Sequence, residues 1–186
     1  MESKVHFWRR TDVEGFERLE LWREGDLLRA AGTVLCAGEG GFRIDHDWTL
    51  GPDWRARTVT VERWGPQGRG RLALERDGGG WRIDGERRPD LDGASEPDLS
   101  VTPFCNSLPI HRLAAEPGAR LTLDTAYIDG PALTVTRSSQ RYERHGPRAV
   151  RYVDLGVARG FEAELVLDED GLVVVYEHLF QRVEPD

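Results

Sequence analysis

The stretch Asp98-Leu-Ser-Val-Thr-Pro-Phe-Cys-Asn-Ser-Leu-Pro-Ile-His-Arg-Leu113 stands apart from the rest of the chain, which alternates polar and apolar residues. Thr102 suits the N-cap of a helix and Pro103 its first residue, because proline lacks the N–H that would have no partner there. Apolar residues follow at roughly helical spacing, at Phe104, Leu108, Ile110 and Leu113. The stretch therefore predicts one short helix with an apolar face.

Pro109 interrupts this helical pattern. A proline inside a helix removes a hydrogen bond and clashes with the preceding turn. We expect it either to kink the helix or to split it into two turns. Because the rest of the chain predicts strands, the apolar face of this helix has to be buried against a sheet.

Most of the remaining sequence alternates in the manner of half-buried strands, with glycine or proline turns between the runs. The segment 87–97 is polar and rich in turn residues, so we interpret it as a loop leading to the helix. Strands are predicted at 16–23, 27–36, 42–50, 54–64, 69–76, 81–83, 121–128, 133–137, 140–144, 150–154, 161–167 and 172–177.

Strands that follow one another at such short intervals favour an antiparallel meander with little room for crossover helices. A sheet of about ten or more strands curls, because each strand is twisted relative to its neighbour. We therefore predict a mainly β fold, in which a strongly curved antiparallel sheet wraps around one central helix. The pattern leaves open whether the sheet closes into a barrel.

The composition indicates a soluble globular protein, and the 186 residues suit a single domain over 1–186. The formal net charge of −8 argues against nucleic-acid binding, which needs a positive surface. No apolar run approaches the roughly 20 residues that span a bilayer. The N-terminal residues lack the apolar segment of a secretory signal, so we expect a cytoplasmic location.

Chemistry-bearing residues are sparse. Neither the two cysteines nor the five histidines have metal-ligand spacing, so the sequence predicts no metal and no cofactor. Cys105 lies close in sequence to Asp98 and His111, which allows a nucleophilic cysteine. Its apolar neighbours favour a buried, inert thiol instead. His46 falls on the apolar face of its strand and is interpreted as a core histidine.

Aromatic and basic residues offer a possible binding surface. Tryptophan suits cavities that hold apolar ligands or sugar faces, but it also fills β cores. Arg55 and Arg57 alternate on one face of a predicted strand, where they would meet either an anionic headgroup or solvent. The tryptophans are Trp8, Trp22, Trp48, Trp54, Trp64 and Trp81.

The segment 98–113 resembles the signature of a bacterial family described as putative glycolipid-binding proteins, formerly a domain of unknown function. The resemblance extends to Trp54-Arg-Ala-Arg57, Gly80-Trp-Arg-Ile-Asp-Gly85, Gln140-Arg-Tyr142 and the C-terminal segment 170–180. It implies a curved antiparallel sheet around one helix, similar to periplasmic lipoprotein carriers. This chain has Cys105 where the family usually has Thr, and His111 where it usually has Arg, which weakens a catalytic role for either.

Our first functional hypothesis is non-enzymatic binding of an amphipathic ligand, a glycolipid or fatty-acyl compound, between the sheet and the helix. The alternatives are an enzyme that uses His111 or His46 with Asp98 as an acid–base pair, and a structural module with a filled core. A cavity of roughly 300–1,000 Å³ would favour a ligand. The predicted ligand-binding residues are Trp54, Arg57, Asp98, Thr102, Phe104, Asn106, Leu108, Ile110 and His111.

Overall fold

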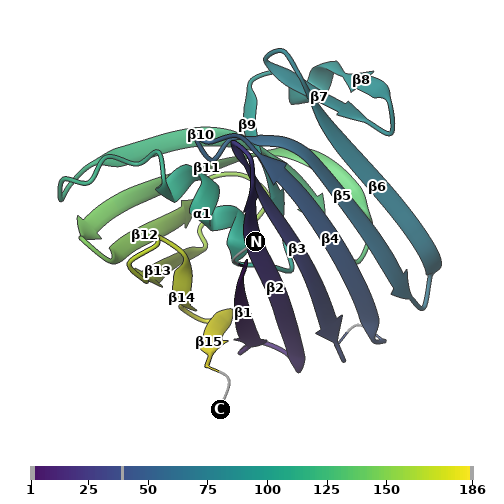
Figure 1. Ribbon diagram of the computed structural model, residues 1–186, viewed down its shortest axis with the longest axis horizontal. Helices are drawn as coiled ribbons and strands as arrows, with labels where there is room; N and C mark the ends of the chain where they lie inside the picture. Colours follow the sequence, from purple (N-terminus) through teal and green to yellow (C-terminus); the bar gives the residue numbers. More distant parts are fainter. Residues whose placement is uncertain (1–2, 39, 185–186) are drawn as a thin grey trace.

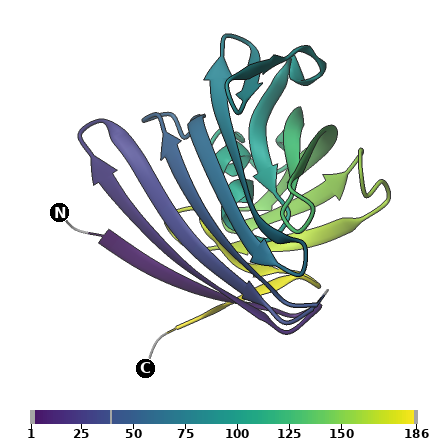
Figure 2. The same ribbon diagram turned by 90° about the vertical axis from the view of Figure 1, so that its right-hand side faces the viewer.

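The computed structural model describes residues 3–38 and 40–184, and these form one 15-stranded sheet. Figures 1 and 2 show the sheet curled around a single α-helix. In chain order the strands are β1 (Ser3–Arg10), β2 (Gly15–Glu24), β3 (Leu27–Cys36), β4 (Phe42–Leu50), β5 (Ala56–Gly65), β6 (Gly68–Asp77), β7 (Gly80–Ile83), β8 (Glu86–Arg88), β9 (Ala94–Leu99), β10 (Arg120–Asp129), β11 (Thr134–Gly146), β12 (Ala149–Asp154), β13 (Glu162–Leu167), β14 (Val173–Tyr176) and β15 (Phe180–Val183).

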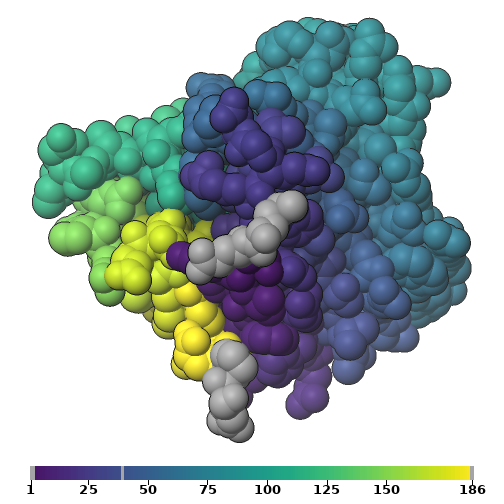
Figure 3. All heavy atoms as spheres, in the orientation of Figure 1, coloured from purple at the N-terminus to yellow at the C-terminus, as the bar shows by residue number. Residues whose placement is uncertain are grey.

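The strand order is β8-β7-β6-β5-β4-β3-β2-β1-β15-β14-β13-β12-β11-β10-β9, so the two ends of the chain meet in the middle of the sheet. Figure 3 shows the N-terminal strands in purple beside the C-terminal strands in yellow, where β1 pairs with β15. The curved, mainly β fold is confirmed. The sheet is not closed into a barrel, because β8 and β9 remain edge strands within the described part of the chain.

The gap beside the edge strand β9 is bridged by side chains. Glu96 of β9 is buried, and its Oε2 accepts a hydrogen bond of 2.9 Å from the backbone N–H of Ala56. Arg112 lies 3.0 Å and Arg76 3.3 Å from the same carboxylate. A buried carboxylate is costly without cations of this kind. Glu96 therefore links β9 to the neighbourhood of β5 and β6 without strand pairing.

The interpretation of 87–97 as a loop is wrong for β9, which pairs with β10 in parallel, the exception in an otherwise antiparallel sheet. Pro97 and the polar residues around it concealed this strand, since proline is depleted in strands generally and occurs mainly in edge strands such as β9. The predicted strands 133–137 and 140–144 are one strand, β11. Polar Ser138 and Ser139 interrupt its alternation, but Ser138 still pairs with Thr125 of β10. Strands β1, β8 and β15 were not predicted from the sequence.

The helix α1 spans Phe104–Ile110, within the predicted segment, and all seven of its residues are buried. Thr102 lies before the helix, and its hydroxyl accepts a hydrogen bond of 3.1 Å from the N–H of Phe104. Pro109 does not split the helix into two turns. It occupies the last turn, and His111 still donates a 3.0 Å hydrogen bond to the carbonyl of Ser107. A short 3-10 helix covers Pro89–Leu91.

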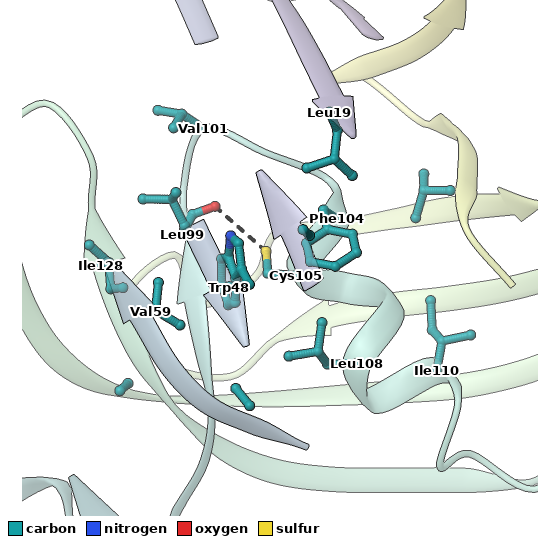
Figure 4. Close-up of a cluster of buried hydrophobic side chains, with 14 of the residues drawn as sticks. Leu19, Trp48, Val59, Leu99, Val101, Phe104, Cys105, Leu108, Ile110 and Ile128 are labelled. Atoms are coloured by element: carbon teal, nitrogen blue, oxygen red, sulfur yellow. Dashed lines mark hydrogen bonds between the residues drawn. The ribbon is translucent and has the colours of Figure 1, made fainter. Parts of the chain in front are cut away.

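The apolar face of α1 fills the space inside the curved sheet. Phe104 and Leu108 are fully buried, and Figure 4 shows both within a cluster that includes Trp48 and Leu19. The rings of Phe104 and Trp48 meet edge to face, with centroids 5.7 Å apart. Cys105 is a buried free thiol, as predicted, and its Sγ lies 3.6 Å from the carbonyl oxygen of Leu99.

Candidate functional site

The end of α1 opens into a pocket of about 820 Å³, which we call the helix-end pocket. Its apolar part is formed by Leu21, Leu28, Trp54, Ile110 and Leu167. Its rim carries charged residues, among them Lys4, Arg23, Arg144, Asp168 and Asp170. The volume lies in the usual range of small-molecule binding sites, and the lining combines apolar and polar groups.

Strand pairing explains why part of this wall assembles. Lys4 of β1 pairs with Leu21 of β2, and Arg23 at the end of β2 pairs with Leu28 of β3. Directly paired residues point to the same side of a sheet. Alternation along each strand then places all of these side chains on the inner face. The inner face of the sheet thus presents the apolar side chains of Leu21 and Leu28 to the pocket, with the cations Lys4 and Arg23 beside them.

An aromatic pair forms another part of the helix-end pocket. The ring of Trp54 stacks on His111, with centroids 3.6 Å apart and planes 13° from parallel. Trp54 adopts a φ of 61°, a left-handed conformation that is unusual for a bulky residue. Its N–H donates a 3.1 Å hydrogen bond to the carbonyl of Gly51, which fixes the turn. Burial lowers the pKa of His111, so the ring favours its neutral form.

The charged side chains at the rim of the helix-end pocket differ in whether they have a partner within the protein. Lys4 lies 2.6 Å from Asp170, and Asp168 pairs with Arg182. Arg144 donates to the carbonyl of Ile110 at 3.4 Å and so covers the end of the helix. The side chain of Arg23 is exposed and forms no hydrogen bond or ion pair with the described residues. It is therefore free to contact a ligand.

A second pocket, of about 250 Å³, adjoins the start of α1 and is called here the aromatic pocket. Asp98, Thr102 and Asn106 line it together with tyrosine and phenylalanine side chains from the C-terminal half of the sheet. Asp98 accepts a 3.0 Å hydrogen bond from Cys105 and a further bond from Gln140. Burial raises the pKa of Asp98, and the nearby charge of Asp154 acts in the same direction.

The predicted ligand-binding residues thus lie in separate places. Trp54, Ile110 and His111 line the helix-end pocket, whereas Asp98, Thr102 and Asn106 line the aromatic pocket. Phe104 and Leu108 are packed in the core between them. Arg57 is exposed on β5 and lines neither pocket.

The pocket-lining residues from the β2–β3 hairpin and from the turn before β14 were not predicted from the sequence. Leu21, Leu28 and Asp168 carry no local signal of a site, because each is ordinary for a strand or a turn. Only the curvature of the sheet brings them to the end of the helix.

The tryptophans divide between core and pocket. Trp8, Trp48 and Trp81 are fully buried, whereas Trp22 and Trp54 line the helix-end pocket. Trp64 lies beneath two guanidinium groups, those of Arg43 and Arg69, at 5.0 and 5.2 Å from its ring centroid. Some tryptophans of this chain therefore fill the β core, and others line a pocket.

His46 is a core histidine, as predicted. It is fully buried, and its Nε2 lies 3.0 Å from Oε1 of Glu17. The indole N–H of Trp48 donates to His46 Nδ1 at 2.8 Å, so Nε2 carries the proton that is donated to Glu17. The hydroxyl of Thr102 donates to the same Glu17 oxygen at 2.7 Å. This arrangement anchors the start of α1, and it pairs His46 with Glu17 instead of Asp98.

Residues 3–38 and 40–184 contain no group of three or more His, Cys, Asp or Glu side chains placed to hold a metal ion. None of their helices has the length and apolar character needed to cross a membrane.

A family model described as putative glycolipid-binding matches residues 5–182. The chain belongs to this family. A crystal structure of a DUF1089 family protein from Pseudomonas aeruginosa has a similar fold, with a TM-score of 0.80 and 32% sequence identity. The match covers 90% of this chain and 92% of that one. No curated protein matches the chain. The family resemblance of the central segment is thereby confirmed.

Proposed function

We propose that the protein binds an amphipathic ligand, a glycolipid or fatty-acyl compound, in the helix-end pocket and releases it chemically unchanged. The observation that carries this proposal is the combination of an apolar wall and a charged rim in one pocket of about 820 Å³. The family description supports a glycolipid as the ligand class.

The acyl chain would lie against Leu21, Leu28 and Ile110, at the end of the helix. The sequence predicts contacts along the helix with Phe104 and Leu108, but these side chains are fully buried in the core. Of the predicted apolar contacts on α1, Ile110 is the one that reaches the pocket. Burial of apolar ligand surface there would supply most of the affinity.

The headgroup would lie at the rim. Trp54 offers an aromatic face, which is a common contact for the apolar side of a sugar ring. Arg23 offers a guanidinium that can bind a carboxylate or phosphate through paired hydrogen bonds. Both are at the pocket and at least partly exposed, so a headgroup could reach them.

Chain length gives the sharpest test. Each buried CH₂ contributes about 0.8 kcal/mol, which corresponds to roughly a fourfold gain in affinity per CH₂. We expect fatty acids or glycolipids of increasing chain length to displace a fluorescent lipid probe at progressively lower concentrations, until the pocket is full. Equal affinities along the series would refute the proposal. Mass spectrometry of the recovered ligands would detect chemical conversion, which would favour the enzyme alternative.

A pair of variants ties the binding to this pocket. Leu21→Arg places a cation in the apolar wall and should weaken probe binding by tenfold or more, on the order of the loss of a buried leucine contact. Leu35→Arg is the matched control, since Leu35 is 56% exposed and lies outside this pocket. Equal probe binding by both variants would place the ligand elsewhere.

We also propose, from the sequence, that binding takes place in the cytoplasm. Cell fractionation and immunoblotting test this location, and recovery of the protein only from the cell envelope would contradict it.

A further inference from the structure

The aromatic pocket lies at the opposite end of α1 from the helix-end pocket and has a different chemical character. Rings from several C-terminal elements meet there. Tyr152 of β12 lies 5.8 Å from Tyr176 of β14 and 6.2 Å from Phe161, measured between ring centroids. Phe180 of β15 lies 6.1 Å from Tyr176, and Tyr127 of β10 completes the aromatic lining. Tyr152, Phe161, Tyr176 and Phe180 thus form one cluster of contacting rings.

The same pocket contains Asp98 and Asp154, and no Lys, Arg or His lines it among the described residues. Asp154 is only 4% exposed. It accepts hydrogen bonds from the N–H groups of Gly156 and Ala158 at 2.7 and 3.1 Å, and from the hydroxyl of Tyr152 at 3.2 Å.

The partners of Asp98 are neutral as well, since they are the thiol of Cys105 and the amide of Gln140. Buried Glu96 forms a contrast, because two arginines accompany it. Burial raises the pKa of Asp98, and a cation bound beside this carboxyl group would favour its ionised form. Because no cationic side chain lines the aromatic pocket among the described residues, its carboxyl groups suit a cation that enters from outside.

We infer that the aromatic pocket binds a small organic cation, with a methylated ammonium group as the best match. The negative faces of aromatic rings attract a cation, and quaternary ammonium groups are bound by aromatic surroundings of this kind. The carboxylate oxygens already accept hydrogen bonds from Gln140, Cys105 and Tyr152. A quaternary ammonium, which has no N–H to donate, loses less there than a primary ammonium.

Geometry supports a small ligand at this place. The volume of about 250 Å³ is below that of pockets for drug-sized molecules, but it suits a single headgroup. The guanidinium of Arg10 lies 5.7 Å from the centroid of Phe180, although Arg10 is not part of the pocket lining. The inference does not depend on the lipid proposal, which concerns the helix-end pocket.

Choline and its uncharged carbon isostere 3,3-dimethylbutanol give a direct test, with calorimetry and ligand-observed NMR as readouts. The two probes have nearly the same shape, so their difference reports the charge. We expect choline to bind at least about tenfold more tightly, and ethanolamine more weakly than choline. Undetectable choline binding, or equal binding of choline and the isostere, would overturn the inference.

The ammonium group could belong to a free metabolite or to a lipid headgroup, and vesicles distinguish these sources. Binding of free choline without preferential binding to phosphatidylcholine vesicles would indicate a free cation. Preferential binding to phosphatidylcholine over phosphatidylglycerol vesicles, lost on competition with choline, would indicate a headgroup. Both results support recognition of the same chemical group.

Variants locate the site. Asp98→Asn removes the charge with little change of shape, and Phe161→Leu removes an aromatic face at a partly buried position. Each should weaken choline binding by about tenfold, on the order of one desolvated cation–aromatic contact. The matched controls Asp26→Asn and Phe16→Leu, both at exposed positions outside the pocket, should not. Phe161→Leu decides the question if Asp98→Asn does not fold.

Variants in each pocket test the lipid site and the cation site independently. Leu21→Arg should leave choline binding unchanged, and Phe161→Leu should leave displacement of the lipid probe unchanged. Choline binding that is insensitive to Phe161→Leu, or abolished by Leu21→Arg, would assign the cation to a different site and overturn the inference.

Discussion

The two ends of α1 differ in how their charges are matched, and this difference bears on what each end can bind. At the helix-end pocket, Lys4 lies beside Asp170 and Arg182 pairs with Asp168, so both signs are present. At the aromatic pocket, Asp98 and Asp154 have only neutral partners. A mixed rim suits an amphipathic molecule with a polar head, whereas carboxyl groups without cationic partners among aromatic rings suit a cation.

The ends also differ in how firmly they are held. The start of α1 is tied to the sheet through the buried chain Trp48, His46, Glu17 and Thr102. The last turn contains Pro109 and ends at an open pocket, where Arg144 caps a carbonyl. The helix is therefore packed in the core at Phe104 and Leu108, lines the aromatic pocket at Asn106 and lines the helix-end pocket at Ile110.

The largest effect should come from the packed part of the helix. Phe104→Ala should lower the free energy of unfolding by about 3–5 kcal/mol, because it removes a fully buried ring. Thermal or denaturant unfolding measures the loss. Phe16→Ala is the control, since Phe16 is 44% exposed, and it should cost much less. Equal losses for the two variants would mean that the helix is not packed inside the sheet.

An intermediate effect should follow from disturbing the anchor at the start of the helix. A Cβ atom at Gly32 would lie 2.2 Å from Cε1 of His46, and hydrogen bonds to Glu17 and Trp48 hold that ring in place. Gly32→Ala should therefore cost about 1–3 kcal/mol of stability through overpacking.

Gly79→Ala is the matched control for this variant, because a Cβ atom at Gly79 meets no other atom within 4 Å. Chemical denaturation of both variants gives the comparison. A fully stable Gly32→Ala protein would show that His46 can move and that the anchor is not rigid.

The smallest effect concerns His111 at the open end. Because burial lowers its pKa, the folded protein prefers the neutral ring. Below about pH 6.5 the unfolded chain binds the proton more readily, so this contribution to stability is present above pH 6.5 and lost as the pH falls through the folded pKa. An NMR titration of His111 in the folded protein, with the urea-unfolded chain as reference, should show a lower folded pKa. An equal or higher folded pKa would contradict the stacked, partly buried ring.

Local sequence was sufficient to predict a strand or helix where the residue pattern within one segment specifies it. The alternation in 27–36 and 42–50 predicted β3 and β4 with their observed bounds, because each strand buries one face and exposes the other. The residues around Phe104 predicted a buried helix with a buried thiol at Cys105, since apolar side chains at helical spacing need a surface to cover them.

The arrangement of the pockets was decided by tertiary structure. Asp98 and Asp154 are far apart in sequence, as are Leu21 and Ile110, and no local pattern links them. Likewise, β9 forms because β10 offers an edge to pair with and because Arg76 and Arg112 compensate the charge of Glu96. The sequence by itself determined the curved sheet, the central helix and the family, through periodicity and a specific motif. Only the tertiary structure decided that the helix fills the concavity and leaves pockets at its ends, because packing and charge compensation depend on contacts between distant segments.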